Sequence, residues 1–495
     1  MNEAVRRVDW RFVLGRPRLG PVELVEPVDA VLAEGVGLVA GGDGPGGVVA
    51  SGPEPVRAAA ARVPSGGWLW GELPGRRRLA PELGALRHEG LADVHRYWTW
   101  RSAAAPTVLV PLDERPAVEL ALTRALGGGR VRTALWRGAA AAGLARLAAR
   151  EVAVVAGRPG DSPLGLAAWL EASRKDFGLD PADGGLSCLF LTPRFRASAS
   201  VVVLVTTGRS ANPRLVVKLP RSATATDSLA REAAGLRAAA GRGLDLDGSA
   251  PRLVFLGEPE ALGGWPVLVE TAVPGRPLDA TEARRRPERA ADAVEAWLRR
   301  VADGSPRQLG AERLERLVAG PLRSVAALGP DERALVERTL AVCAPLAAAD
   351  LPVVLEHGDL SHPNVLLGPG GRIGAVDWEL AEPRGLPLHD LTFFLAYVAG
   401  ARRRAHTPEQ HEAAVRSAEG DTATRLGRRA ADLGIRPQLI APLVVASWAR
   451  QAAEIWRRTD SQDPQWLRGS RVVRLWRRAL ALATGEEVAA CASST

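Results

Sequence analysis

Three oxygen-bearing side chains stand at an informative spacing in the segment 357–379. The first part reads His-Gly-Asp-Leu-Ser-His-Pro-Asn and contains Asp359 and Asn364, five residues apart. The second part reads Val-Asp-Trp-Glu and contains Asp377, thirteen residues after Asn364. Carboxylate and amide oxygens are ligands that hard cations such as Mg²⁺ prefer. The residue types therefore predict a site for a cation that holds the phosphates of a nucleotide.

A β-hairpin would bring Asn364 and Asp377 together. Apolar residues 365–367 and 373–376 flank the turn-forming stretch 368–372, which reads Gly-Pro-Gly-Gly-Arg. A hairpin of this length would place the two side chains next to each other at one end of its strands. Asp and Asn are also common in ordinary turns. The two motifs together, at hairpin spacing, favour a functional site over a plain turn.

Each residue of the motif can be given a chemical role. Asp359 would orient and deprotonate an acceptor hydroxyl as the general base, and Asn364 and Asp377 would ligate Mg²⁺. His357 is expected to hold the loop backbone rather than to touch substrate. Pro363 would restrict the conformations of the loop.

These motifs resemble the catalytic core of the aminoglycoside phosphotransferase and choline kinase-like family, relatives of the protein kinases. That family has His-Gly-Asp-x4-Asn where protein kinases have His-Arg-Asp-x4-Asn, and Asp-Trp-Glu or similar in place of Asp-Phe-Gly. The resemblance implies an α+β, bilobal kinase-like fold, ATP or GTP with Mg²⁺, and phosphorylation of a small molecule's hydroxyl. It covers residues 179–495, with an N-lobe at about 185–275 and a C-lobe at about 276–495.

The resemblance implies three further residues upstream of the motif. Lys218 ends an apolar, strand-like run that begins at Arg214, and it would bind phosphate. Glu232 lies in a segment of helical periodicity, 228–237, and would pair with Lys218. Glu270 ends a second apolar run, where the hinge of the family presents backbone groups to adenine.

Composition supports a special role for Lys218. Of the 64 basic residues only Lys175 and Lys218 are lysines, and the rest are arginines. In a chain with this bias, a lysine indicates a position that needs a compact ammonium group. Chance survival is the alternative, and it suits Lys175.

Two segments of the chain fit the family pattern less directly. The stretch 191–200, where protein kinases carry a Gly-rich loop, contains no glycine. Ser198 and Ser200 are candidates there for phosphate contact, and ordinary turn residues are the alternative. In the segment 385–395, the resemblance implies that Asp390 supports the catalytic loop, and an acid at the start of an apolar helix is a compatible interpretation.

Residues 1–178 lie outside the resemblance. Short apolar runs at 30–32, 36–40, 48–50, 67–73, 107–111 and 152–156 alternate with helical patterns, which predicts a smaller α/β Rossmann-like domain. Residues 8–14 are expected to dock as an initial strand or arm. The glycine run at 39–48 does not fit Gly-x-Gly-x-x-Gly. A faint likeness to class I methyltransferases lacks the acidic-Gly-x-Gly signature, so a docking or scaffolding role is preferred.

Composition excludes other classes of protein. A length of 495 residues with 46% hydrophobic content predicts two to three domains. The three cysteines, Cys188, Cys343 and Cys491, show neither disulfide nor metal spacing. Neither a signal-peptide core nor an apolar run of membrane length is found, so a cytoplasmic location is expected. The net charge of +8 comes from dispersed arginines, so a nucleic-acid partner is not expected.

The acceptor is not specified by the sequence. Residues 283–347 and 408–485 have helical patterns, and helices in this region form the acceptor pocket of the family. Their tryptophans, at 448, 456, 466 and 476, are expected mainly in the core. Aminosugars, amino alcohols, nucleosides and lipid-linked sugars remain open, as does the oligomeric state. The alternative functions are a kinase-like binding protein without turnover, and a methyltransferase with an accessory kinase-like part.

Overall fold

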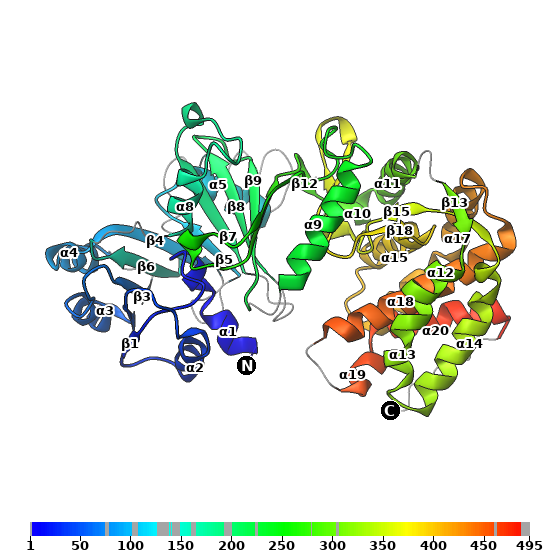
Figure 1. Cartoon of the computed structure of the whole chain (residues 1–495), viewed down its shortest axis with the longest axis horizontal. Coiled ribbons are helices and arrows are strands. Elements are labelled where there is room, and N and C mark those ends of the chain that lie inside the picture. The colour runs from blue at the N-terminus through cyan, green and yellow to red at the C-terminus, as the bar shows by residue number, and fades with distance from the viewer. Residues whose placement is uncertain are drawn as a thin grey trace. The chain divides into compact units, whose positions relative to one another are not determined.

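The computed structural model of the chain forms two compact units (Figure 1). The first unit comprises Met1–Ala230 and Leu253–Ala272, and the second comprises Arg231–Arg252 and Val273–Thr495. The structure describes residues 2–74, 79–100, 107–125, 138, 140, 149–159, 165–192, 200–222, 226–278, 280–302, 306–459 and 463–486.

Eleven strands form one sheet in the described part of the first unit, in the order β1-β2-β3-β6-β4-β5-β7-β8-β9-β11-β10. The strands are β1 (Val22–Val25), β2 (Gly47–Ser51), β3 (Trp68–Pro74), β4 (Ala92–Trp100), β5 (Val108–Pro111), β6 (Glu151–Gly157), β7 (Leu186–Leu191), β8 (Val201–Thr207), β9 (Leu215–Leu219), β10 (Leu253–Gly257) and β11 (Val267–Thr271). The helices of this unit are α1 (Asn2–Arg7), α2 (Ala30–Val39), α3 (Pro53–Ala60), α4 (Ala80–His88), α5 (Arg115–Ala125) and α8 (Leu166–Ala172), and α9 (Thr226–Ala240) contains the boundary between the units.

The sheet changes from parallel to antiparallel pairing along its strand order. Strands β1, β2 and β3 are parallel and are connected by α2 and α3, as expected for an α/β layer. Antiparallel pairs follow from β3 to β10, and β5 pairs with β7 through Leu109 and Phe190. The expected boundary at residue 178 falls between α8 and β7, inside the first unit. Residues 1–178 therefore share a sheet with the strands that carry Lys218 and Glu270.

Two of the expected N-terminal strands are wrong. The apolar runs at 30–32 and 36–40 lie in the single helix α2, which Asp29 caps by accepting a hydrogen bond from the Leu32 N–H. The side-chain cap favours one continuous helix, and Gly35 between the two runs serves close packing instead of a turn, since a Cβ there would lie 2.2 Å from the Ala4 carbonyl oxygen. Residues 8–14 do not form a strand but dock as a buried segment, with a 3₁₀ turn at Asp9–Phe12.

Helices cover both faces of the sheet. The N-terminal segment, α2 and α8 share a core with Trp68 and Trp70 of β3, and Trp10 stacks on Trp70 at 4.9 Å. On the other face, α3 and α4 pack around Leu69, and α5 packs around Val110. Burial of large aromatic side chains is the main stabilising contribution of such a core.

A buried ion pair holds the N-terminal segment against the end of β9. The Asp9 carboxylate accepts from Nε and Nη2 of Arg221 at 2.9 and 2.7 Å, and both side chains are almost fully buried. Arg11 donates to the carbonyl oxygen of Arg221 at 2.7 Å. Burial lowers the pKa of the Arg11 guanidinium to about 10. Because Arg221 follows Lys218 by three residues, these contacts fix the chain just beyond Lys218.

The second unit is mostly helical, as expected for 283–347 and 408–485. Its helices are α10 (Ala280–Arg285), α11 (Pro287–Val301), α12 (Ala311–Leu314), α13 (Gly320–Ala326), α14 (Pro330–Ala347), α15 (His389–Arg403), α16 (Pro408–Ser417), α17 (Glu419–Asp432), α18 (Ile440–Arg458), α19 (Pro464–Arg468) and α20 (Arg471–Thr484). Short strands form three small sheets: β12 (Arg276–Pro277) with β16 (Val365–Leu367) and β17 (Ile373–Ala375), β13 (Arg307–Leu309) with β14 (Asp350–Pro352), and β15 (Val354–Glu356) with β18 (Glu382–Gly385).

Helices α14, α18 and α20 pack side by side in this unit (Figure 1). Trp476 of α20 is fully buried and donates from Nε1 to Thr339 of α14 at 2.9 Å. Trp448 is also buried, whereas Trp466 is 46% exposed, so the expectation of core tryptophans holds for the first two. None of the described helices is both long and apolar enough to cross a membrane.

Breaking the Asp9–Arg221 pair should destabilise the first unit. Asp9→Leu removes the carboxylate that pairs with Arg221 and lies 3.7 Å from Arg11, and Arg221→Met removes the closer of the two buried guanidiniums around Asp9, each at a cost of about 3–5 kcal/mol in the free energy of unfolding. The double variant removes both charges and should recover much of that loss. Urea unfolding followed by tryptophan fluorescence measures all three. If the double variant lost the sum of the two single losses in the free energy of unfolding, a direct ionic contact would be contradicted.

Candidate active site

The predicted hairpin is present and brings two of the predicted site residues together. Strands β16 and β17 are antiparallel, with Val365 opposite Ala375. Beyond this pair the N–H of Val376 donates to the carbonyl oxygen of Asn364 at 3.0 Å. Asn364 and Asp377 therefore flank the same end of the hairpin.

His357 joins this hairpin end to the loop that carries Asp359. Its Nε2 lies 3.0 Å from the carbonyl oxygen of Val376, and its Nδ1 accepts from the Asp359 N–H at 3.3 Å. The ring is 1% exposed and lies 4.8 Å from the ring of Trp378. With Nε2 protonated, one imidazole bridges the backbone next to Asp359 and the backbone next to Asp377. The ring thus contacts the backbone at both segments, and its predicted role of holding the loop stays a prediction.

Asn364 also contacts Asp359 directly. Its Nδ2 donates to the carbonyl oxygen of Asp359 at 2.9 Å and to Oδ2 at 3.2 Å. Because the amide nitrogen is committed to these bonds, Oδ1 is the Asn364 atom suited to a cation. The Ser361 N–H donates to the same Asp359 carbonyl at 2.7 Å, which tightens the loop.

Asp377 has a left-handed backbone conformation, with φ of 72°. For a residue other than glycine such a conformation costs on the order of 1 kcal/mol or more and is common at functional sites. The next residue holds it in place, because Trp378 is fully buried and donates from Nε1 to the Ala375 carbonyl at 2.9 Å. Gly235 of α9 packs on this segment so closely that a Cβ would lie 2.4 Å from the Trp378 carbonyl oxygen.

The Asp390 carboxylate holds the start of the loop that carries Asp359. Its Oδ2 accepts from the His357 N–H at 2.8 Å, and its Oδ1 accepts from the Gly358 N–H at 2.9 Å. Burial, followed by the negative charge of Glu356, raises the pKa of Asp390, whereas the two N–H donors lower it. Asp390 also lies in the first turn of α15, where the helix dipole favours a carboxylate. These contacts are compatible with support of the loop, which stays a prediction, and with an acid at the start of the helix.

Gly358 is required by the backbone at this point. Its φ is +81°, and a Cβ would lie 2.2 Å from the carbonyl oxygen of Leu380. No side chain fits there without moving the chain. The glycine of the His-Gly-Asp motif thus allows the two adjacent N–H groups to face one carboxylate.

A buried polar network beneath the loop was not predicted from the sequence. Glu356 accepts from the Leu386 N–H at 2.8 Å and forms an ion pair with Arg450. Gln451 donates from Nε2 to the Gly358 carbonyl at 2.6 Å, and the same atom lies 3.1 Å from Nε2 of His389. Burial lowers the pKa of His389 to about 4, so the ring is neutral and accepts from Gln451. The one feature of the sequence that could have indicated this network is the presence of polar residues inside apolar runs.

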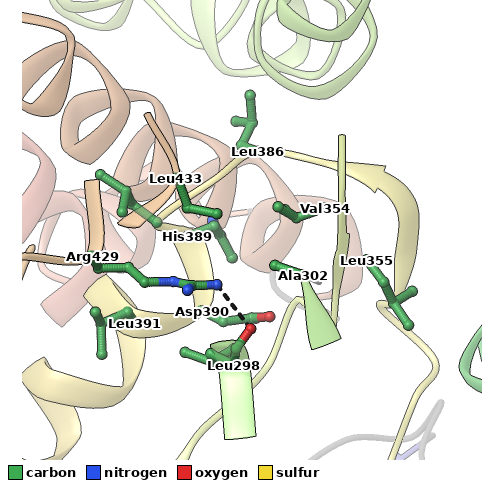
Figure 2. A pocket seen from close by; sticks show the side chains of 11 residues that line it. Leu298, Ala302, Val354, Leu355, Leu386, His389, Asp390, Leu391, Arg429 and Leu433 are labelled. Atoms are coloured by element: carbon green, nitrogen blue, oxygen red, sulfur yellow. Dashed lines mark hydrogen bonds between the residues drawn. The ribbon is translucent and has the colours of Figure 1, made fainter. Parts of the chain in front are cut away.

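A small cavity of about 20 Å³ lies behind Asp390 (Figure 2). Mostly apolar side chains line it, and Arg429 donates across it to the Leu298 carbonyl at 2.8 Å. This volume holds about one water molecule. The cavity is therefore a gap in the core behind the loop and is too small for an acceptor.

The predicted nucleotide-side residues lie on several elements. Lys218 of β9 is 7% exposed, and its Nζ lies 3.9 Å from Oε1 of Glu270 on β11. Sequence reasoning assigned Glu270 to the adenine hinge and did not predict this contact. Glu232 is buried on α9, and its pairing with Lys218 stays a prediction. Ser200 precedes β8, and Ser198 lies outside the described residues.

The described residues contain no group of three or more His, Cys, Asp and Glu side chains arranged to hold a metal ion. Mg²⁺ does not require such a group, because it keeps several waters and binds through one or two protein oxygens plus phosphate oxygens. Asn364 and Asp377 supply two hard oxygen ligands at one end of the hairpin. The donor set therefore fits a Mg²⁺–nucleotide complex.

Comparison with known proteins relates part of the chain to one enzyme family. Residues 193–433 match the model of the phosphotransferase enzyme family. The resemblance to the aminoglycoside phosphotransferase and choline kinase-like family is therefore confirmed for this segment, together with its α+β kinase-like fold. The match does not reach residues 1–178, whose Rossmann-like interpretation is supported by the parallel strands β1–β3. No curated protein matches the chain.

Solved structures similar to part of this chain carry the same family names. A putative aminoglycoside phosphotransferase from Ralstonia eutropha is 14% identical, covers 65% of this chain and 97% of its own, and has a TM-score of 0.40. The GDP complex of aminoglycoside 2'-phosphotransferase-IIIa is 18% identical, with coverages of 64% and 98% and a TM-score of 0.37. Choline kinase LicA from Streptococcus pneumoniae is 16% identical, with coverages of 57% and 89% and a TM-score of 0.35.

Removing the Asp390 carboxylate should loosen the catalytic loop. Asp390→Ala leaves two buried N–H groups without an acceptor, and we expect the free energy of unfolding to fall by about 2–5 kcal/mol. Asp390→Asn retains one acceptor oxygen and should lose less. Asp432→Ala, at a half-exposed ion pair with Arg299, is the control and should cost at most about 1 kcal/mol. Chemical unfolding measures these differences. Equal effects of Asp390→Ala and the control would show that the Asp390 carboxylate does not hold the loop.

The buried neutral His389 should make stability depend on pH. The pKa of His389 is about 4 in the folded chain and 6.5 for an ordinary imidazole, so its contribution to stability is full above pH 6.5 and is lost as the pH falls towards 4. Between pH 7 and 5 the wild type should lose about 2 kcal/mol more than His389→Asn, which cannot titrate. Unfolding free energies at both pH values test this. Parallel curves for the two proteins would show that His389 is not held neutral.

Proposed function

We propose that the protein is a phosphotransferase that uses ATP or GTP with Mg²⁺ to phosphorylate a hydroxyl group of a small molecule. The observation that carries this proposal is the cluster of Asp359, Asn364 and Asp377, tied together by His357, within a segment of the phosphotransferase family. Aminoglycosides, sugars and amino alcohols are the acceptor types to be tested.

The chemistry follows from the contacts of Asp359. Its carboxylate would accept the proton of the acceptor hydroxyl while the oxygen forms a bond to the γ-phosphorus. The bond from that phosphorus to the bridging oxygen breaks, and the nucleoside diphosphate leaves. The hydrogen bond from Asn364 at 3.2 Å keeps Oδ2 in place. General-base catalysis of this kind contributes about 10²–10⁴-fold to a rate.

The other residues would hold the nucleotide. Mg²⁺ bound by Asn364 and Asp377 would neutralise charge on the phosphate oxygens. Lys218 would place an ammonium group at the phosphates, and Glu270 at 3.9 Å limits the positions of that group. Asp390 and His357 would keep Asp359 within reach of the acceptor without touching it.

Two other functions give different outcomes in simple tests. A kinase-like binding protein without turnover would bind Mg-ATP but consume none with any acceptor. A methyltransferase with an accessory kinase-like part would be stabilised by S-adenosylmethionine and not by Mg-ATP. The intact set of Asp359, Asn364, Asp377 and Lys218 favours turnover over both alternatives.

Substitution of the general base should separate turnover from binding. In an ADP-release assay with hydroxylated acceptors, Asp359→Asn should lower kcat by about 10²–10⁴-fold. Affinity for Mg-AMP-PNP should change by a few-fold at most, because the substitution leaves the two cation ligands in place. Asp432→Asn serves as the control. Wild-type turnover by Asp359→Asn would refute the catalytic assignment.

A further inference from the structure

The N-terminal segment, residues 2–15, packs against the back of the strand that carries Lys218. Leu219, the neighbour of Lys218, shares one buried core with Trp10 and Phe12 of this segment. Because side chains alternate along a strand, Lys218 projects from the opposite face. Lys218 is the last but one residue of β9, and the pairing of β9 with β8 ends at Leu219. The position of Lys218 therefore depends on what holds the chain beyond Leu219, because an unsupported strand end frays.

Arg11 binds the chain beyond this strand end. Its side chain is fully buried, and its Nη2 donates to the carbonyl oxygen of Arg221 at 2.7 Å. The Nε of Arg11 donates to the Pro17 carbonyl oxygen at 2.9 Å, and its Nη1 donates to that of Val8 at 3.1 Å. A planar guanidinium has donors that point in several fixed directions. One side chain therefore joins the N-terminal segment, the loop before β1 and the end of β9.

Trp265 binds the preceding residue of the same stretch. Its Nε1 donates to the Pro220 carbonyl oxygen at 2.9 Å, and the ring of Phe12 lies 6.5 Å from its ring. Trp265 is buried in the core that also contains Phe12 and Leu219. The carbonyl groups of Pro220 and Arg221, the first two residues after β9, are thus each bound by a buried side chain.

The charges at this contact restrict its geometry further. The Asp9 carboxylate lies 2.7 Å from Nη2 of Arg221 and 3.7 Å from Nη1 of Arg11. All three side chains are buried. Such a triad stabilises a fold no better than apolar side chains of similar size. Its directional contacts instead specify one position of Arg221 relative to the N-terminal segment.

The other end of the N-terminal segment is anchored at the parallel strands. Arg7 donates from Nη1 and Nη2 to the two carboxylate oxygens of Glu72 in β3, at 2.6 and 2.7 Å. Its Nη2 also donates to Asp29, the residue that caps α2, at 2.9 Å. Residues 7–11 therefore connect the α/β layer of the first unit with the end of β9. Through them, the part of the chain outside the family match reaches the strand of Lys218.

We propose that Arg11 and Trp265 are positioning residues for nucleotide binding, which hold the end of β9 so that the Lys218 ammonium group meets the phosphates. This role rests on the proposed phosphotransferase function and deepens it. Neither side chain touches the nucleotide, since both are buried in the core on the other face of the sheet. Release of either carbonyl group beyond β9 lets the strand end fray, and the nucleotide must then order Lys218 when it binds. Residues 1–178 are thus a working part of the nucleotide site rather than a separate module.

The experiment separates the phosphate part of nucleotide affinity from the rest. For the full-length wild type and each variant, the dissociation constants of Mg-AMP-PNP and of adenosine are measured by calorimetric titration, well below the melting temperature of every protein. GMP-PNP and guanosine replace them if the wild type prefers guanine. Arg11→Gln should weaken Mg-AMP-PNP roughly fivefold or more and leave adenosine within about twofold, because Lys218 contacts only the phosphates. Arg11→Lys keeps a charged donor and should recover part of the affinity.

Trp265→Phe is the milder variant. It keeps an aromatic ring in the core and removes only the donor to the Pro220 carbonyl group. It should weaken Mg-AMP-PNP more than adenosine, by a smaller factor than Arg11→Gln does, and it decides the matter if Arg11→Gln does not fold.

Leu86→Ala is the control for stability. Leu86 is fully buried in the core around α3 and α4, towards the β1 end of the sheet. The cavity that this substitution leaves should lower the melting temperature. Both dissociation constants should stay within about twofold of the wild type, since the end of β9 keeps its contacts.

Three results overturn the positioning role. The first is wild-type affinity for Mg-AMP-PNP in Arg11→Gln, and the second is an equal loss of Mg-AMP-PNP and adenosine, which indicates general loosening of the unit. The third is a loss in Leu86→Ala as large as that in Arg11→Gln, which shows that lower stability alone weakens binding. Failure of the wild type to bind either Mg-nucleotide overturns the phosphotransferase function itself, and the positioning role falls with it.

Discussion

The hydrogen bonds from the His357 and Gly358 N–H groups to the Asp390 carboxylate are the constraint on which the site depends. They turn two consecutive backbone donors towards one buried acceptor, at 2.8 and 2.9 Å. This geometry requires the positive φ of Gly358 and leaves His357 pointing at the backbone of Val376. One carboxylate on α15 therefore sets the position of the loop, and through His357 the position of the hairpin end.

The polar network around that carboxylate is costly to bury, and its members pair with one another except at Nδ1 of His389, which has no hydrogen-bond partner in the described part of the chain. Glu356 is paired with Arg450, and Gln451 donates to the Gly358 carbonyl at 2.6 Å. Buried charges of this kind add little net stability compared with apolar side chains, but loss of one partner is expensive. The network therefore favours a single arrangement of the loop, which suits a group that must meet a hydroxyl within hydrogen-bond distance.

The sequence predicted those parts of the site that are local in the chain. The spacing of Asp359, Asn364 and Asp377 defined a loop and a hairpin, and short-range turn chemistry is enough to form both. The pairing of Arg450 and Gln451 with the loop joins residues about ninety positions apart, and no local pattern encodes such contacts. The Lys218–Glu270 contact likewise depends on the register between β9 and β11.

In the N-terminal part, too, contacts between residues distant in the chain could not be predicted from the sequence. Most of its strands were visible as apolar runs, but the division of two runs at 30–40 was wrong because a capped helix joins them. Its continuity with the sheet of Lys218 depends on the pairing of β5 with β7, far apart in the chain. The buried Asp9–Arg221 pair, across 212 residues, could not be read from either end alone.

Calorimetric titration of AMP-PNP into the protein, with and without Mg²⁺, tests the central claim most directly because it needs no knowledge of the acceptor. A cation held by Asn364 and Asp377 predicts one site per chain, Mg²⁺-dependent affinity, and a loss of at least tenfold in Asp377→Ala but not in Asp432→Ala. Binding that is independent of Mg²⁺ and unchanged in Asp377→Ala would contradict the account.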